Sequence, residues 1–141
     1  MPEVFNYQRK VKIDVKLFQE FGAEAFKIIS EAKGRTATIA FVSDARMRGL
    51  NKTFRGKNST TDVLSFPFAA DEFEMGANTL GDIVISAAQA RKQALENNLD
   101  LEAEIKQLIV HGILHLCGFD HETDKGEMNR RELKLRDKLG I

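Results

Sequence analysis

Apolar residues recur along this chain with two periods, one typical of helices and one typical of strands. Over residues 17–29 they return every three or four positions, which predicts a helix with one buried stripe, and Asp14 precedes it as a cap. We expect that helix to end near Gly34. Segments 36–42 and 80–85 are instead dense in β-branched and apolar residues, and this pattern predicts two buried strands.

The same two periods predict the remaining elements. A strand over 62–68 contains Pro67, which places its end at a sheet edge or at a bulge. The acidic, glycine-containing residues 71–78 favour a mobile loop. The other expected elements are a strand over 3–7 and helices over 44–55, 86–97, 100–116 and 128–139.

Polar residues stand where these helices need caps. Asp44 and Asp100 can each accept hydrogen bonds from the free N–H groups of a first turn. Ser86 followed by Gln89 has the form of a capping box. Gly56 is expected to end the helix that Asp44 begins, because glycine readily adopts the left-handed conformation of a helix end.

Strands and helices are interleaved along the chain, which is typical of α+β or mixed α/β folds. We predict one α+β domain over residues 1–141, with a mixed sheet of about four strands covered by helices. The helix over 100–116 is apolar on most sides, so we expect it to lie at the centre. The pattern leaves the order and direction of the strands open.

The composition is that of a soluble globular protein. Of 141 residues, 43% are hydrophobic and 30% are charged, and this length is sufficient for a substantial core. The single cysteine excludes an intramolecular disulfide and fits a reducing compartment. The first ten residues lack the apolar segment of a signal peptide, and no apolar run approaches the roughly 20 residues that span a bilayer. We therefore expect a cytoplasmic protein without a membrane partner.

The charges balance overall but cluster locally. There are 21 basic and 21 acidic side chains, which argues mildly against a protein that holds nucleic acid by bulk electrostatics. The segment from Arg46 to Lys57 nevertheless has five basic residues and no acidic one. This basic segment is either a solvated helix face or a phosphate-binding surface, and both interpretations stay open. Its basic residues are Arg46, Arg48, Lys52, Arg55 and Lys57.

All three histidines of the chain fall within eleven residues. His111 and His115 are four positions apart in the predicted central helix, so their rings share one face. Gly118 can end the helix and turn the chain back, which lets His121 reach the same point. Three neutral imidazoles leave one position of a tetrahedral ion open, as in catalytic zinc sites. We predict one metal ion per chain, either zinc or another divalent transition metal.

Gly112 and Cys117 lie among the histidines and limit the reactions and the ligands that the site can have. The frame matches the metalloprotease motif His-Glu-x-x-His-x-x-Gly-x-x-His, except that Gly112 stands where a peptidase needs glutamate as its general base. Gly112 instead keeps space open beside the metal or lets another backbone approach closely. Cys117 points about 200° away from His115 around the helix, so we expect a buried thiol and not a ligand.

Three charged residues are candidates for the chemistry around the metal. Asp120 and Glu122 flank His121 and could accept a hydrogen bond from an imidazole or handle protons, although both also fit an exposed loop. Arg55, near the end of the basic segment, is the candidate for binding phosphate because a guanidinium matches phosphate bidentately. Hydrolysis of a phosphodiester requires such a cation where negative charge develops.

Three segments together resemble the YbeY family of bacterial metal-dependent endoribonucleases, which act in ribosomal RNA maturation. They read LNKTFRGKNSTTDVLSFP over 50–67, LGDI over 80–83 and HGILHLCGFDH over 111–121. Their order and spacing are those of the family, and the general layout fits over essentially the full chain. The third segment is highly specific because Gly112 distinguishes it from the peptidases.

The resemblance implies that His111, His115 and His121 are zinc ligands and that Arg55 is the functionally important arginine of the family. It implies an α+β fold with the site in a cleft floored by the metal helix and walled by positive charge. The implied activity is cleavage of single-stranded RNA, in maturation of the 3′ end of small-subunit ribosomal RNA and in ribosome quality control. The implied partners are ribosomal RNA, the small ribosomal subunit and its assembly factors.

Two other functions remain open. A metallohydrolase of peptides or amides would use the same three histidines, although the glycine at position 112 argues against it. A ribosome-binding factor would use the metal chiefly for structure, although an open coordination position argues against that function. Tests of RNA and peptide cleavage distinguish the three hypotheses.

Overall fold

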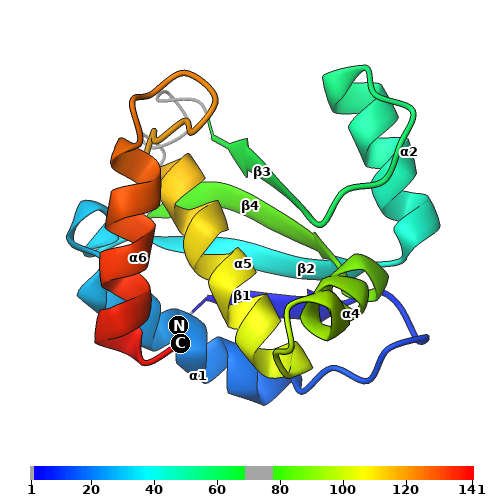
Figure 1. Cartoon of the computed structure of the whole chain (residues 1–141), viewed down its shortest axis with the longest axis horizontal. Coiled ribbons are helices and arrows are strands. Elements are labelled where there is room, and N and C mark those ends of the chain that lie inside the picture. Colours follow the sequence, from blue (N-terminus) through cyan, green and yellow to red (C-terminus); the bar gives the residue numbers. More distant parts are fainter. Residues whose placement is uncertain (1, 69–77) are drawn as a thin grey trace.

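The fold is built on one mixed sheet of four strands in the order β1-β2-β4-β3 (Figure 1). The computed structural model describes residues 2–68 and 78–141, so residues 71–77 of the predicted loop lie outside the described residues. Strands β1, β2 and β4 are parallel to one another, and β3 pairs antiparallel with β4 at the edge of the sheet. The strands are β1 Glu3–Asn6, β2 Thr36–Val42, β3 Val63–Pro67 and β4 Thr79–Ser86.

Five helices and one 3-10 turn accompany the sheet in the described part of the chain, which confirms the predicted α+β fold. Three predicted caps are present, because the side chains of Asp14, Ser86 and Asp100 each accept a hydrogen bond from an N–H group three residues further on. The helices are α1 Val15–Ile28, α2 Asp44–Arg55, α4 Ala87–Glu96, α5 Leu101–Leu116 and α6 Glu127–Leu139, and the 3-10 turn is Ser30–Ala32.

One predicted helix boundary and one predicted cap are wrong. Helix α1 ends at Ile28 and not near Gly34, because Ile29 leaves the helix in an extended conformation and is fully buried. The cap of α2 is Ser43, whose hydroxyl accepts from the N–H of Arg46, and not Asp44. The end of α2 at Gly56 is confirmed, since this glycine has the left-handed conformation.

Asp44 is a hydrogen-bond acceptor for three side chains and does not cap the helix. Its carboxylate accepts hydrogen bonds from the hydroxyls of Thr60 and Ser86, and from the Gln89 amide at 3.5 Å. The capping box at Ser86 is therefore only half formed, because the Gln89 side chain turns to Asp44 and the Ser86 N–H donates to Asp62. These bonds attach α2 to the end of β4 and the start of α4.

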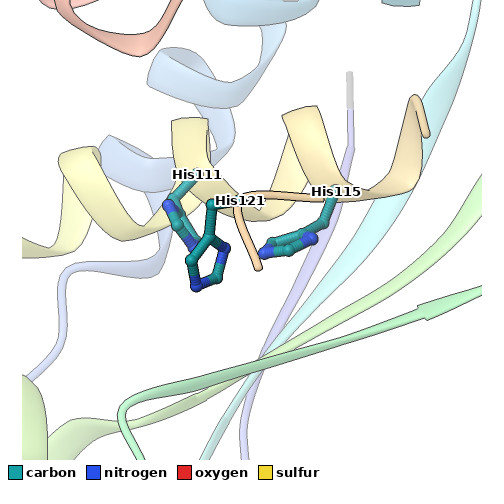
Figure 2. Close-up of side chains that lie close together, drawn as sticks. All are labelled: His111, His115 and His121. Carbon is teal, nitrogen blue, oxygen red and sulfur yellow. The ribbon is translucent and has the colours of Figure 1, made fainter. Parts of the chain in front are cut away.

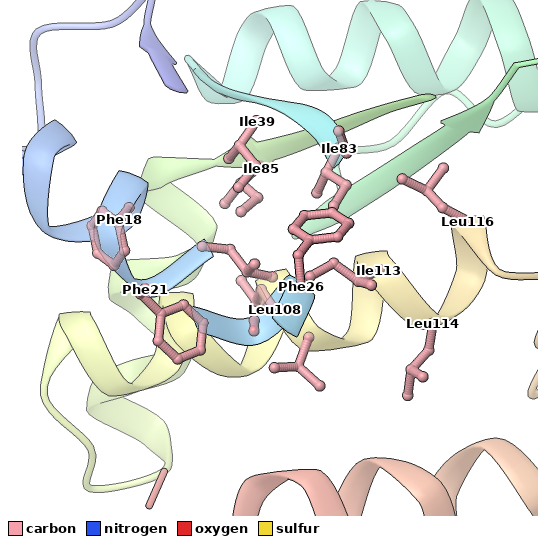
Figure 3. Packing of buried hydrophobic residues seen from close by; sticks show 14 of the residues in the cluster. Phe18, Phe21, Phe26, Ile39, Ile83, Ile85, Leu108, Ile113, Leu114 and Leu116 are labelled. Atoms are coloured by element: carbon pink, nitrogen blue, oxygen red, sulfur yellow. The ribbon is translucent and has the colours of Figure 1, made fainter. Parts of the chain in front are cut away.

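The two faces of the sheet are covered unequally. Side chains that include Ile39, Ile83 and Ile85 point from β2 and β4 toward α1 and α5, where they form the main core (Figure 3). The neighbouring positions Val42 and Val84 point to the opposite face, where they form a small second cluster with Leu64 of β3 and Met47 of α2.

Helix α5 is the central helix that the sequence predicts. It crosses the sheet (Figure 1), and nine of its sixteen residues are buried. Even Glu104 is buried, and its carboxylate accepts from the amide of Asn97 at 2.9 Å. Neither α5 nor another helix in the described ranges is long and apolar enough to cross a membrane.

Candidate metal centre

The three histidine rings converge at one point beside α5 (Figure 2). His111 and His115 lie one turn apart on the helix, and their ring centroids are 4.8 Å apart. The ring of His121 comes from the loop after the helix and lies 5.3 Å from His111 and 5.2 Å from His115. One ligand nitrogen of each ring lies within 4.8 Å of the others. The predicted histidine cluster is therefore formed.

The turn after α5 carries His121 back to the helix. Gly118 has a φ of +101°, which side chains rarely adopt, and its N–H donates to the carbonyl of His115 at 3.0 Å. The N–H of Phe119 donates to the carbonyl of Leu114 at 3.1 Å, so the chain reverses within one turn. The expectation that Gly118 allows the reversal is confirmed.

The three imidazoles fit a divalent metal ion. Burial, followed by the proximity of His111 and His121, lowers the pKa of His115 below its usual value of 6.5. The low pKa favours the neutral ring, which is the form that binds metal. Nitrogens at 2.0–2.1 Å from a tetrahedral ion lie about 3.4 Å apart, so a small contraction of the cluster suffices. Three nitrogens leave one coordination position for water or substrate.

A carboxylate from α6 orients one of the rings, and this residue was missed in the sequence. Oε1 of Glu132 lies 3.1 Å from Nδ1 of His111. Glu132 is 6% exposed, and Arg136 lies 3.7 Å from the same oxygen. This contact directs Nε2 of His111 toward the centre, as carboxylates do for metal-binding histidines. The signal was present, since a glutamate stands between Met128 and Leu135 on the buried stripe of α6.

Asp120 and Glu122 line one cavity together with the three histidines, and their catalytic role stays a prediction. Oδ1 of Asp120 accepts from the N–H of Glu122 at 3.0 Å, which fixes the loop that carries His121. Oε1 of Glu122 lies 3.6 Å from Nη2 of Arg55, and both side chains are substantially exposed. The observed hydrogen-bond acceptor of a histidine is Glu132, because α6 packs against α5 and brings its buried face to the ring.

Arg55 and the histidines share one cavity of about 930 Å³. One wall is formed by α5 and the His121 loop, and the other by β3 and the end of α2. Lys57 also lines this cavity, whereas Arg46 lines a separate groove on the α2 side of the sheet. Of the basic segment, Arg46 therefore lines one concave surface and Arg55 and Lys57 line the other, whereas Arg48 and Lys52 line neither.

Gly112 packs against the sheet and not against the metal or another backbone. A Cβ atom at this position would lie 2.8 Å from Cγ2 of Ile83, which is fully buried. The carbonyl of Gly112 accepts from the hydroxyl of Ser65 at 3.3 Å. The two roles that the sequence suggested for Gly112 are therefore wrong, because the side chain of Ile83 fills the space.

The thiol of Cys117 is partly buried against the core, and burial raises its pKa to about 11.

The fold and the site together fit the class of metal-dependent hydrolases, because three histidines on a buried helix and its following turn could hold one metal ion. The sequence model of the family described as Endoribonuclease YbeY matches residues 3–140. The chain belongs to this family of endoribonucleases.

Relatives of the chain agree with this assignment. The chain is 47% identical over 109 residues to an Endoribonuclease YbeY of Koribacter versatilis, a match covering 77% of the chain and 67% of the relative. It is 40% identical over 133 residues to an Endoribonuclease YbeY of a Nitratiruptor species, covering 94% of the chain and 85% of that relative. The solution structure of TM1509 from Thermotoga maritima is similar with a TM-score of 0.67 at 27% identity, covering 99% of this chain and 89% of that one.

Proposed function

We propose that this protein is a zinc-dependent endoribonuclease that cuts single-stranded RNA. Its substrate is ribosomal RNA, and its role is in maturation of the 3′ end of the small-subunit RNA and in ribosome quality control. The small ribosomal subunit and its assembly factors are the proposed partners, and the proposed location is the cytoplasm. The observation that carries the proposal is the cavity that holds Arg55 together with His111, His115 and His121.

The metal is assigned to the three histidines. A divalent ion with an open position supplies an activated water near neutral pH and positive charge for an anionic substrate. Neutral imidazole nitrogens suit zinc, although they also suit other divalent transition metals. Glu132 keeps Nδ1 of His111 occupied, so that the other nitrogen of this ring faces the centre.

Arg55 is assigned to the phosphate. Arg55 belongs to the end of α2 and lines the cavity with the three histidines, and its guanidinium can form two parallel hydrogen bonds to phosphoryl oxygens. Glu122 holds Arg55 through one exposed ion pair, which is weak enough to exchange for a phosphate. Gly112 offers no carboxylate in the position where peptidases place their base, so the site suits a phosphodiester better than a peptide.

Cleavage of a labelled single-stranded RNA tests the assignment of the metal to the histidines and of the phosphate to Arg55. We expect internal cuts by the wild type that stop with a chelator, with His115→Ala and with Arg55→Ala. Arg48→Ala is the matched control, because it removes the same charge from the same helix at a residue outside the cavity lining. An equal loss with Arg48→Ala would show that bulk charge, and not the place of Arg55, determines activity.

Metal content and peptide cleavage distinguish the other functions. Purified wild type should contain about one zinc ion per chain, and His115→Ala should lose it. Cleavage of peptides without cleavage of RNA would favour the peptidase alternative. RNA that is bound but never cut with any divalent metal would favour a binding factor with a structural metal.

A further inference from the structure

A second concave surface lies on the α2 side of the sheet. It is a groove of about 750 Å³, within the range of about 300–1,000 Å³ that is typical of ligand sites. Its floor is formed by alternate residues of β2 and β4, which point away from α5. Its wall is formed by α2, and its residues include Ala40, Val42 and Val84 from the sheet and Leu50 and Phe54 from the helix.

The groove is adjacent to the metal cavity. Phe54 and Phe66 line both surfaces and separate one from the other. Their rings meet edge to face at a centroid distance of 5.2 Å. Phe54 is nevertheless 63% exposed, so its ring is accessible to a ligand. A strand of RNA held at Arg55 therefore meets an exposed aromatic ring directly beside the cavity.

The chemistry of the groove suits a nucleobase. Every base has a flat face that stacks on an aromatic ring, and both Phe54 and Tyr7 present exposed rings here. Arg46 offers donors and Asp82 offers acceptors for the polar edge of a base. Arg46 and Arg55 lie nine residues apart on α2, or about 13 Å along the helix axis, so one helix carries cations beside both surfaces.

We propose that this groove is a subsite for a base of the RNA strand next to the phosphate that is cut, with Phe54 as the stacking residue. The inference rests on the proposed function, since it places the RNA at Arg55 and the histidines. It explains why the sequence has an apolar, exposed residue within the basic segment. It also assigns the selection of single strands to this groove, because a base within a duplex cannot stack on a protein ring.

RNA with 2-aminopurine at successive positions around the cut tests the subsite. The fluorescence of this base falls when it stacks, and the experiment uses the whole chain with His115→Ala as a background that does not cut. We expect quenching at one or two positions beside the cut and its loss with Phe54→Ala. In steady-state cleavage, Phe54→Ala should raise KM by roughly five- to 150-fold with little change in kcat.

Three further variants distinguish stacking from general apolar contact and from misfolding. Phe54→Tyr keeps the ring and should retain quenching and KM, whereas Phe54→Leu keeps apolar area without the ring and should behave like Phe54→Ala. Leu95→Ala is the control, because Leu95 is likewise apolar and exposed, on α4. Wild-type values with Phe54→Leu would overturn the inference and favour a protein segment as the occupant.

The outcomes separate this inference from the proposed function. Cleavage of RNA without quenching at any position would overturn the subsite and leave the nuclease intact. Quenching that depends on Phe54, but without cleavage by the wild type, would support the subsite and overturn the nuclease. A wild type that neither binds nor cuts RNA would overturn both.

Discussion

The two helices that line the candidate site are attached to the sheet in different ways. Helix α5 has nine buried residues and lies in the main core, whereas α2 has only Met47 and Asn51 buried. A hydrogen-bonded anchor at Asp44 compensates for the small apolar contact of α2. Asn51 adds a second polar anchor, since its amide donates to the carbonyl of Ser59 at 2.9 Å.

This difference corresponds to what we propose that each side holds. Three metal ligands require fixed positions, and a helix in a close-packed core provides them. A flexible RNA strand requires charge and exposed aromatic surface, which an amphipathic helix at the side of the sheet offers at the expense of burial. The comparison teaches that the proposed metal side is made by packing and the proposed RNA side by polar attachment.

The largest expected effect is on the core beneath α5. Ile109→Ala removes a fully buried side chain and should lower the free energy of unfolding by about 2–5 kcal/mol. Leu50→Ala on α2 removes a partly buried side chain and should cost only about 1 kcal/mol. Urea unfolding of both variants measures the contrast, and equal losses would contradict the unequal attachment of the two helices.

Loss of the α6 carboxylate should affect the metal side alone. Glu132→Gln replaces the acceptor that holds His111, so we expect metal affinity to fall by about 10- to 100-fold. Competition with a chelating dye measures this affinity, and Glu96→Gln, an exposed change on α4, should leave it unchanged. Wild-type affinity in Glu132→Gln would mean that the charge of this carboxylate is not needed, because a glutamine amide oxygen can still accept from Nδ1 of His111.

Loss of the Asp44 anchor of α2 should lower RNA affinity and leave metal binding unchanged. Asp44→Ala removes the acceptor of Thr60, Ser86 and Gln89, and should cost about 1–3 kcal/mol of stability because these donors lose their partner. Metal content should stay at the wild-type value while RNA affinity falls, because only the wall with Arg55 is released. Loss of metal together with RNA binding would show that the two sides are not independent.

Replacement of a glycine by alanine should stabilise the protein when it is made in α2 and destabilise it when it is made in α5. Gly49→Ala on α2 meets open space and should stabilise the protein by about 0.5–1 kcal/mol, since alanine is the better helix former. In Gly112→Ala on α5 the new methyl group contacts Ile83, and this overpacking should cost about 1–3 kcal/mol. The cost exceeds the gain in helix propensity, so the protein should lose stability. Thermal unfolding midpoints of the two variants give the signs directly.

The smallest effect is expected from a surface ion pair that ties α6 to the turn after α1. Two hydrogen bonds from Arg131 lower the pKa of Glu31 from 4.5 to about 2. The folded-state pKa is depressed, so the stabilisation is present above pH 4.5 and disappears as the pH falls toward 2. Glu31→Gln should therefore cost at most about 1 kcal/mol at pH 7 and nothing near pH 2. Unfolding curves across this range test the trend.

Much of the fold was predictable because its signals are local. The caps at Asp14, Ser86 and Asp100 depend on residues three positions away, and the limits of β2 follow from one apolar run. Boundaries failed where burial decided them. Ile29 leaves α1 early because the core accepts its side chain, and no local pattern records that event.

The sequence by itself determined the histidine cluster, because the spacing of His111 and His115 and the glycine at 118 act within three helical turns. Only the tertiary structure decided what surrounds it. Glu132 reaches His111 from another helix, and Arg55 faces the cavity from across the sheet. Such contacts depend on which faces of distant elements pack together, and on the order of the strands, which hydrophobic periodicity does not encode.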